Sequence, residues 1–334
     1  MRRLASVGIV VVALTAVAVT PGFANVEAHA QAPAGDPPTT IGLTSIGAVS
    51  TSGTKAIEAL APIAGRTLAL TSIVAMIADS GATVGVTLVE LGGSNPITWS
   101  QNGGAVVTAA STYKLVALML EAENIAAGAT DPNGLVCFTP DDYEAGWFDD
   151  YTDGACYTRN ELASRAARQS DNTAGHMLVR DVGGADALNA WAASVGATNS
   201  AFFYDNTTTS DDLAALWAAE AKGKLGGAAA QGWLYPLLIG TTTESGVPAG
   251  VAGGVAVVHK TGTLDTIDND AALVTSGPSG AYVLTVMTDG LGGADGWALI
   301  ASISAQVWQF ESLRPQPQIS SPVPPVPDFY PRAE

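Results

Sequence analysis

Strand-type segments occur near the two ends of this chain, and a long helical stretch separates them. Two segments with strand character cover residues 82–91 and 96–100, and three more lie at 255–259, 271–275 and 281–288. Gly, Asp and Pro turns separate them, which favours antiparallel pairing. We therefore predict a mixed α/β fold of the α+β type, in which an antiparallel sheet built from both ends is covered by helices and holds an inserted helical subdomain.

Helical patterns dominate the rest of the chain. Residues 57–79 predict one or two helices, interrupted near Pro62 and Gly65, because these residues break helical patterns. Residues 111–124 contain no such breaker and predict a buried helix. Further helices are predicted at 173–182, 185–195, 211–222 and 297–310, and Thr158 with Glu161 forms a capping box for one more.

The first 30 residues are typical of a secretory signal. An uncharged, mostly apolar run at 4–19 follows Arg2 and Arg3, and small residues allow cleavage after Ala30 or, as an alternative, after Ala24. The run is shorter than the roughly 20 residues that a membrane-spanning helix needs. We expect no stable membrane span, and a mature protein that is secreted or lies in the periplasmic or cell-wall space.

The whole chain then divides into four parts. These are a signal peptide at 1–30, an N-terminal linker at 31–56, a folded domain at 57–310 with a helical insertion at about 111–250, and a Pro-rich tail at 311–334. We expect a monomer.

The charge balance limits the partners of the chain. A formal net charge of −17 repels phosphate backbones, so we expect no nucleic acid partner. The acidic stretch at 131–153 matches no EF-hand spacing and predicts a solvated loop. His176 and His259 stand without zinc-type spacing and predict packing or surface roles. We expect neither a metal nor a cofactor.

The two cysteines, Cys137 and Cys156, are 19 positions apart. In an oxidising compartment an even pair at this separation is expected to form a disulfide. The bond would close the acidic loop.

Three short motifs follow one another in the chain. Ser111 and Lys114 are three residues apart at the start of a predicted helix, so both side chains share one face and the helix dipole favours an alkoxide at the serine. A buried lysine can lose its charge and act as a base. Ser170-Asp171-Asn172 lies between two predicted helices, and Lys260-Thr261-Gly262 follows a predicted strand. Taken separately, the first motif can arise by chance, the second can be a helix cap and the third can be a turn. All three in this order rarely occur together by chance.

These motifs resemble those of the class A serine β-lactamases and the related penicillin-binding proteins. Further similarity occurs at Thr152-Asp153-Gly154, Glu161-Leu162, Asn172-Thr173-Ala174 and Gly183-Gly184, and it extends over about 57–310. The resemblance implies a β-lactamase/transpeptidase-like fold and a hydrolase acting on β-lactam antibiotics through an acyl-enzyme, and thus a role in antibiotic breakdown and response.

The resemblance also implies a role for each motif residue. Ser111 attacks a carbonyl and Lys114 helps to take its proton, while Ser170 passes a proton to the leaving nitrogen and Lys260 holds Ser170 and the negative charge of the substrate. The substrate-binding residues are Asn172, Thr261, Gly262 and Thr263, and the backbone amides of Ser111 and Thr263 form the oxyanion hole.

The chain departs from this family at two points. The loop glutamate that activates water for deacylation has no obvious counterpart, because Glu220 lies in a predicted helix and Glu244 is close to the third motif. Asp205 is the nearest carboxylate and the candidate substitute base. The distal arginine that binds the substrate carboxylate is also missing. A Tyr-x-Asn triplet at Tyr204 is a weaker alternative to Ser-Asp-Asn.

We therefore expect an exported serine hydrolase that is acylated at Ser111 by β-lactams or peptidoglycan-like amides and is deacylated slowly. A D-alanyl-D-alanine carboxypeptidase or an esterase with the same acylation machinery is the second hypothesis. A non-hydrolytic protein that binds β-lactams or the cell wall is the third. In each case the expected partner is a small β-lactam or a peptidoglycan peptide.

Overall fold

The structure, a computed structural model, describes residues 51–93 and 95–314, and of residues 51–63 it describes the backbone only. The predicted signal peptide, most of the linker and most of the Pro-rich tail lie outside the described residues. Within the described ranges, no helix is both long and apolar enough to cross a membrane.

The described residues form α-helices and strands in the predicted order. The helices are α1 (Thr51–Ser80), α2 (Tyr113–Ala126), α3 (Arg159–Arg168), α4 (Asn172–Asp181), α5 (Gly184–Val195), α6 (Ser210–Ala221), α7 (Gly227–Leu234) and α8 (Gly293–Ser312). The strands are β1 (Thr83–Glu90), β2 (Thr98–Gln101), β3 (Val107–Thr108), β4 (Leu135–Cys137), β5 (Cys156–Thr158), β6 (Thr207–Thr208), β7 (Val257–Leu264), β8 (Ile267–Gly277) and β9 (Gly280–Asp289).

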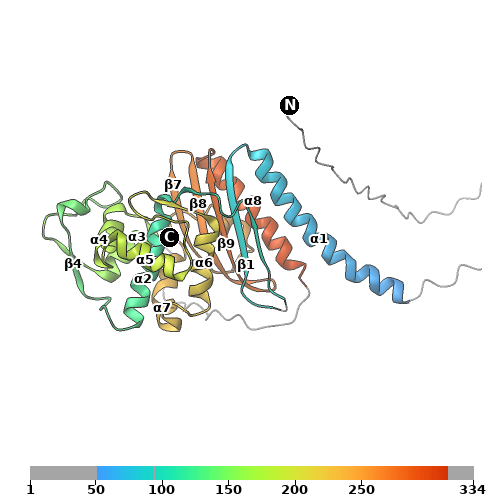
Figure 1. Ribbon diagram of the computed structural model, residues 1–334, viewed down its shortest axis with the longest axis horizontal. Helices are drawn as coiled ribbons and strands as arrows, with labels where there is room; N and C mark the ends of the chain where they lie inside the picture. Colours follow the sequence, from blue (N-terminus) through green and yellow to red (C-terminus); the bar gives the residue numbers. More distant parts are fainter. Residues whose placement is uncertain (1–50, 94, 315–334) are drawn as a thin grey trace, which may run out of the picture. The chain divides into compact units, whose positions relative to one another are not determined.

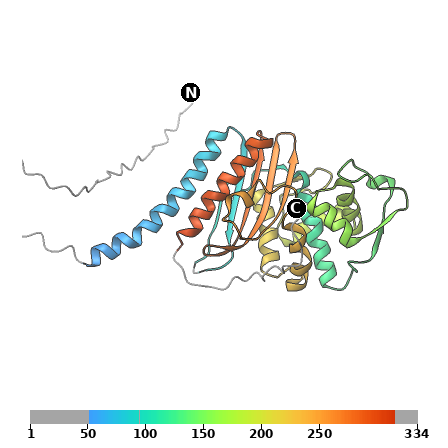
Figure 2. The ribbon, with the colours of Figure 1, turned by 180° about the vertical axis from the view of Figure 1, so that it is seen from behind.

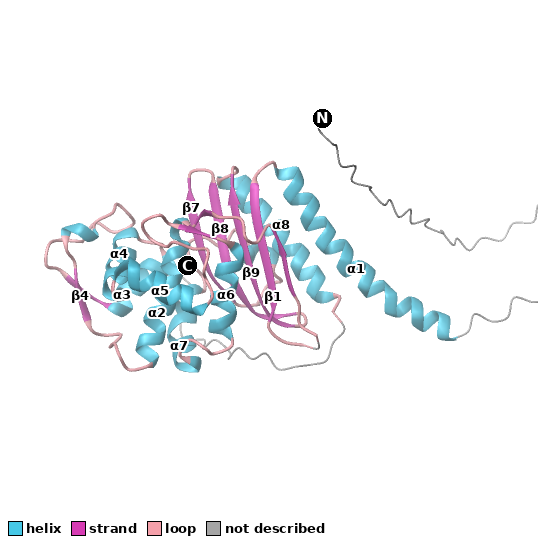
Figure 3. Ribbon diagram, viewed as in Figure 1, coloured by secondary structure: helices cyan, strands magenta, loops and turns pink. Residues whose placement is uncertain are grey.

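Five of these strands form one antiparallel sheet in the order β2-β1-β9-β8-β7 (Figure 3). The first two come from the beginning of the domain and the other three from its end. Their register places Val86 of β1 opposite Val286 of β9, about 200 residues further along the chain. The prediction of a sheet built from both ends, with a helical insertion between them, is confirmed.

Helices cover both faces of the sheet (Figures 1 and 2). Helices α1 and α8 pack on one face, and α6 with the other inserted helices lies on the opposite face. Neighbouring residues of β9 therefore enter different cores: Val283 packs with the inserted helices and Leu284 packs with α1 and α8. Because both faces are covered, β8 and β9 are buried along almost their whole length instead of at alternate residues, and β9 is largely apolar.

The predicted interruption of the first helix is wrong. Helix α1 runs unbroken from Thr51 to Ser80. Its Ala69, Ile73 and Ile77 follow helical spacing and are buried in the core shared with α8. A Cβ at Gly65 would lie 2.7 Å from Leu313 Cδ1, so this glycine permits close packing instead of breaking the helix. Burial of the apolar stripe outweighs the local preference.

Several short elements were not predicted. The two-residue strands β3 and β6 pair with each other, and β4 pairs with β5. Helix α7 is composed largely of Gly and Ala, so it has no strong amphipathic pattern. In contrast, the predicted N-cap is confirmed, because Thr158 accepts a hydrogen bond from Glu161 N at 3.1 Å. The Glu161 carboxylate accepts from Arg165 at 2.8 Å.

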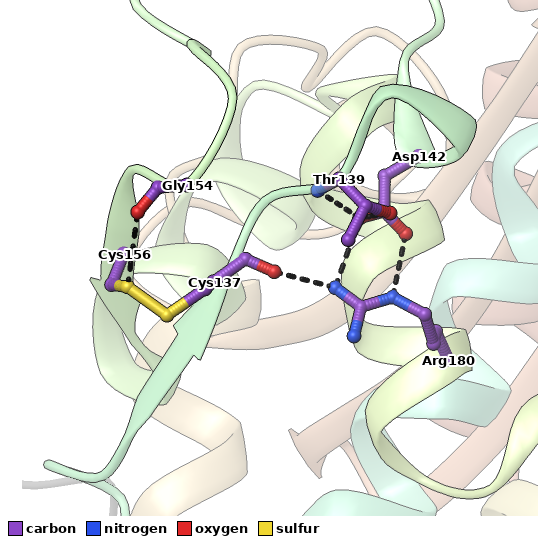
Figure 4. The surroundings of a disulfide bond; sticks show 6 residues. All are labelled: Cys137, Thr139, Asp142, Gly154, Cys156 and Arg180. Atoms are coloured by element: carbon purple, nitrogen blue, oxygen red, sulfur yellow. Dashed lines mark hydrogen bonds and ion pairs between the residues drawn. A yellow bond between two sulfur atoms is a disulfide. The ribbon is translucent and has the colours of Figure 1, made fainter.

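The disulfide joins Cys137 to Cys156, as predicted (Figure 4). The two residues face each other across the β4–β5 ladder. Arg180 of α4 supports the same corner, because its guanidinium donates to the Cys137 carbonyl at 2.8 Å and to both carboxylate oxygens of Asp142. The loop between the cysteines is thus fixed at its base to α4.

His259 does not stand alone, which corrects its predicted role. It is fully buried on β7, with Nδ1 2.9 Å from Asp270 Oδ1 and Nε2 3.1 Å from Glu244 Oε1. Burial opposes the charged imidazolium, but the two carboxylates outweigh it and raise the pKa of His259 to about 9. Asp270 also accepts a hydrogen bond from Val247 N at 2.8 Å. Through these contacts, the segment that contains Glu244 and Val247, which precedes β7, is attached to Asp270 of β8.

We predict that replacing both cysteines by serine lowers the melting temperature without removing catalytic groups. The chain-entropy model assigns about 3 kcal/mol to closing a loop of this size. Thermal unfolding of the wild-type chain and the double variant, each checked by non-reducing mass spectrometry, measures the effect. Equal melting temperatures would contradict the stabilising role.

We also predict a pH-dependent contribution of His259 to stability. Its pKa is about 9 in the folded chain and about 6.5 when unfolded, so its stabilisation is complete below about pH 6.5 and is lost as pH rises through about 9. The full contribution is on the order of 3 kcal/mol. Below about pH 6.5, His259→Gln should be less stable than the wild type by this amount. Above about pH 9, the two chains should have similar free energies of unfolding.

Thermal unfolding of both chains between about pH 6 and pH 10 tests this linkage. His176→Gln is the matched control, because burial lowers the pKa of His176, so this residue adds no pH dependence above the ordinary histidine pKa of about 6.5. A constant difference between wild type and His259→Gln across the range would exclude the linkage.

Candidate active site

The three sequence motifs meet at one end of the inserted helices. Ser111 lies in a short 3₁₀ helix, Ala110–Thr112, which leads into α2. Ser170 lies between α3 and α4, and Lys260 lies on the edge strand β7. A continuous set of hydrogen bonds through the two lysines joins them.

The backbone before Ser111 is held in an unusual conformation. Ala110 has φ of 46°, in the left-handed region that a residue with a Cβ seldom adopts. Its carbonyl accepts a hydrogen bond from Asn206 Nδ2 at 3.1 Å, and Ala109 N donates to the Asn206 carbonyl at 2.6 Å. Asn269 of β8 donates to the Ala109 carbonyl at 3.2 Å. These contacts stabilise the conformation that presents Ser111.

Strand β7 approaches the same turn closely. A Cβ at Gly262 would lie 2.7 Å from the Ala109 carbonyl and 3.0 Å from Ser111 N. Only glycine allows this approach without displacing the backbone. The Lys260-Thr261-Gly262 segment is therefore placed directly beside the amide of Ser111.

Lys114 is almost completely buried and makes three contacts. Its Nζ lies 2.9 Å from Ser111 Oγ, 2.9 Å from the Ser170 carbonyl and 2.8 Å from Asn172 Oδ1. Burial lowers the pKa of Lys114 to about 8, although the charges of Glu144 and Asp171 oppose this shift.

The three contacts also determine what a neutral Lys114 does. A neutral amine has two N–H groups and one lone pair, and the Ser170 carbonyl and the Asn172 carbonyl oxygen can only accept. The Ser111 hydroxyl is the one partner that can donate. Deprotonated Lys114 is thus oriented to accept the proton of Ser111.

Ser170 connects the two lysines. Its carbonyl accepts from Lys114, and its Oγ accepts from Lys260 Nζ at 2.9 Å. Ser170 has φ of 60°, which allows its carbonyl and hydroxyl to contact different lysines. Lys260 is buried, and burial together with the nearby charge of Lys114 lowers its pKa well below the ordinary value.

Helix α4 supplies the next wall of the site. Asn172 accepts from Lys114 through Oδ1 and donates to the Ala145 carbonyl through Nδ2 at 2.9 Å. A Cβ at Gly175 would lie 2.6 Å from Lys114 Cε and 2.9 Å from the Tyr113 hydroxyl. The absence of a side chain there lets α2 and α4 approach at Lys114.

The sheet edge that the resemblance assigns to the substrate carboxylate lies on β7. In β7 and its neighbour β8, Lys260 is the only lysine or arginine. Thr261 and Thr263 lie opposite Asp270 and Asp268 in the β7–β8 register. The next lysine or arginine after Lys260 is Arg314. It forms an ion pair at 2.9 Å with Glu90, the last residue of β1. Lys260 is the cation that this edge of the sheet itself supplies.

None of the carboxylates weighed from the sequence reaches Lys114 by a hydrogen bond. Asp205 is exposed in the turn at 202–205. Glu220 is buried on α6 and accepts from the Tyr235 hydroxyl at 2.5 Å, while Glu244 pairs with His259. Tyr204 is 83% exposed, and the two lysines contact Ser170, so the Tyr-x-Asn alternative is not supported by this geometry.

The acidic loop is not simply solvated, and the structure corrects that interpretation. We call residues 139–153 the strap. Asp171, the N-cap of α4, is fully buried and accepts hydrogen bonds from the backbone amides of Trp147 and Phe148 and from the Tyr151 hydroxyl at 2.7 Å. The middle residue of the Ser-Asp-Asn motif therefore holds the strap beside the site.

The strap brings in residues that sequence reasoning missed. Glu144 Oε2 lies 2.8 Å from His176 Nε2, one helical turn after Asn172 on α4. The Phe203 ring packs edge-on against His176 at 4.9 Å and against Tyr113 at 5.6 Å. The four-residue spacing from Asn172 to His176 was the available signal, but the partner of His176 lies 32 positions away.

Comparisons with known proteins agree with this arrangement. The profile described as the β-lactamase enzyme family matches residues 69–310. The solved structure of PBP-A is 25% identical, with 73% of this chain and 95% of that chain covered and a TM-score of 0.68. A β-lactamase from Sphaerobacter thermophilus is 26% identical, with 74% and 99% covered and a TM-score of 0.64. A search of curated protein sequences finds no match.

A mutant of PBP-A has also been solved as an acyl-enzyme complex with penicillin G, and it is 26% identical to this chain. The family match extends over most of the chain and accords with the sheet, its helical covering and the three motifs around Ser111. Family and fold together identify a serine hydrolase that acts on amide bonds, and the chain belongs to the β-lactamase enzyme family.

Proposed function

We propose that this protein is an exported hydrolase whose Ser111 is acylated by β-lactams or peptidoglycan-like amides, and that release of the acyl group is the slow step. The observation that supports this most strongly is the 2.9 Å contact between Lys114 Nζ and Ser111 Oγ, made by a lysine whose pKa is lowered to about 8. An amine with that pKa is available as a base near neutral pH.

Acylation follows from the contacts of these residues. Ser111 Oγ attacks the amide carbon while its proton passes to the lone pair of Lys114. The C–N bond then breaks, and the leaving nitrogen takes a proton from the Ser170 hydroxyl, which Lys260 supports. The proton that Lys114 took then replaces the one that Ser170 gave up, which returns both residues to their starting states. The Ser170 carbonyl accepts a hydrogen bond from Lys114 Nζ and keeps the two residues adjacent.

The developing oxyanion needs backbone donors. We assign this role to the amides of Ser111 and Thr263, supported by the close approach of Gly262 to Ser111 N. Asn172 then faces the amide side chain of the substrate, and Thr261 with Thr263 faces its carboxylate. Lys260 supplies the positive charge for that carboxylate.

Slow release is supported by the positions of the loop carboxylates. Hydrolysis of an acyl-enzyme needs a water and a base beside it. Asp205 is exposed, Glu220 is buried elsewhere and Glu244 is held by His259. The capture of penicillin G on a PBP-A mutant is consistent with a stable adduct in a similar protein.

The remaining features of the proposal come from the sequence. We propose cleavage of a signal at 1–30, a catalytic domain at 57–310 and a monomeric mature protein in the secreted, periplasmic or cell-wall space. A D-alanyl-D-alanine peptide assayed beside penicillin distinguishes a carboxypeptidase from a β-lactamase. Binding without an adduct would indicate the non-hydrolytic alternative.

We predict that a fluorescent penicillin labels Ser111 covalently and that Lys114 controls the rate. Ser111→Ala should abolish labelling, and Lys114→Met should slow it by about 100-fold or more, as loss of a general base does. In the wild type the labelling rate should rise as pH increases through about 8, because Lys114 then loses its proton. Gel fluorescence over time measures these rates.

Lys222→Met is the matched control for the lysine variant, since Lys222 is exposed at the end of α6. It should label at the wild-type rate. Persistent labelling of Ser111→Ala would end the assignment of the nucleophile, and an unchanged rate in Lys114→Met would remove Lys114 from the mechanism.

We further predict a burst in the pre-steady-state hydrolysis of nitrocefin. Its amplitude should equal the enzyme concentration, and a slow phase should follow because release limits turnover. Stopped-flow absorbance measures both phases. Fast linear hydrolysis without a burst would contradict the proposed slow step.

A further inference from the structure

The strap provides a carboxylate beside Lys114 that the sequence comparison with class A enzymes does not predict. Both backbone groups of Glu144 bind the Thr173 side chain on α4: Glu144 N donates to Oγ1 at 3.1 Å, and Oγ1 donates to the Glu144 carbonyl at 2.8 Å. The position of Glu144 along α4 is therefore fixed from both sides.

The side-chain amide of Asn172 connects the strap next to Glu144 with the amine of Lys114. Asn172 Nδ2 donates to the carbonyl of Ala145, the neighbour of Glu144, and Asn172 Oδ1 accepts from Lys114 Nζ. The strap and Lys114 are thus hydrogen-bonded to opposite ends of one side chain. Lys114 is in turn 2.9 Å from Ser111 Oγ.

The carboxylate of Glu144 has a defined direction. Its Oε2 lies 2.8 Å from His176 Nε2, and the His176 ring is backed by Phe203. The Glu144 side chain is 53% exposed, so water can reach it. The same Phe203 ring packs against Tyr113, the neighbour of Lys114 on α2, so the Glu144–His176 pair lies on the side of α4 that meets α2.

We propose that Glu144, positioned by His176, is the general base that activates water for release of the acyl group from Ser111. This inference rests on the proposed function. It assigns a role in the second step of that reaction to a residue pair outside the three motifs.

The proposed step balances without any further reactant. Water gives one proton to the Glu144 carboxylate, and its oxygen bonds to the acyl carbon. The bond from that carbon to Ser111 Oγ breaks, and the proton returns to Oγ through Lys114, which is hydrogen-bonded to it. Release stays slow because one oxygen of the half-exposed carboxylate is engaged by His176.

The experiment follows a penicillin G adduct on the exported chain by intact mass spectrometry. Glu144→Gln should form the adduct within about threefold of the wild-type rate and release it about 10-fold more slowly or worse, because only release needs this base. Asp141→Asn is the matched control, since it removes one exposed carboxylate from the same strap. Asp205→Asn tests the competing base. Both controls should release the adduct at the wild-type rate.

Three further variants separate loss of the chemical group from loss of the fold. Glu144→Asp keeps a carboxylate and should release the adduct faster than Glu144→Gln. His176→Gln keeps a donor for the carboxylate and should release it faster than His176→Ala, as expected for a positioning residue. Hydroxylamine, a nucleophile that needs no base, should restore release in Glu144→Gln.

The outcomes distinguish the two proposals. If no adduct forms on the wild-type chain, the proposed function fails and the role of Glu144 fails with it. If the adduct forms and leaves wild type and Glu144→Gln equally fast, only the role of Glu144 is overturned. Slower release from Asp205→Asn but not from Glu144→Gln would likewise transfer the role to Asp205.

Discussion

Two lysine amines, Lys114 and Lys260, are removed from solvent within one site, and most of the local structure supplies them with partners. An unpaired buried ammonium is unfavourable by several kcal/mol, so each amine needs acceptors that the surrounding elements hold in place. Ser170 serves both through different oxygens, and Asn172 completes the set around Lys114. Burial lowers the pKa of Lys114 to about 8, and a neutral Lys114 no longer repels the charge of Lys260. The cost of burying the first lysine is thus a source of its basicity.

The sheet makes this burial possible by separating two kinds of chemistry on one strand. Lys260 of β7 faces the inserted helices, whereas its neighbour His259 enters the cluster with Asp270 and Glu244. The burial of Lys260 lowers its pKa, while the two carboxylates raise that of His259. Adjacent residues thus acquire opposite shifts because the strand alternates between two environments.

The Ser-Asp-Asn motif has a structural role beyond its contacts with the lysines. Asp171 caps α4 through Ala174 N at 2.9 Å and also holds the strap through Tyr151 and the backbone amides of Trp147 and Phe148. The disulfide and Arg180 hold the base of the same loop. The strap is therefore positioned at both ends by α4, the helix that carries Asn172 and His176.

Local patterns determined much of this protein. The strand-type segments at both ends predicted the antiparallel sheet, because a strand can be read from a few neighbouring residues. The spacing of Ser111 and Lys114 predicted their contact, since one helical turn places them on the same face. Tertiary structure decided the rest. Helix α1 continues through Gly65 because α8 packs there, and Glu144 meets His176 because the strap folds back on α4. Such contacts join residues far apart in the chain, and no local pattern records which distant group will satisfy a buried or half-buried charge.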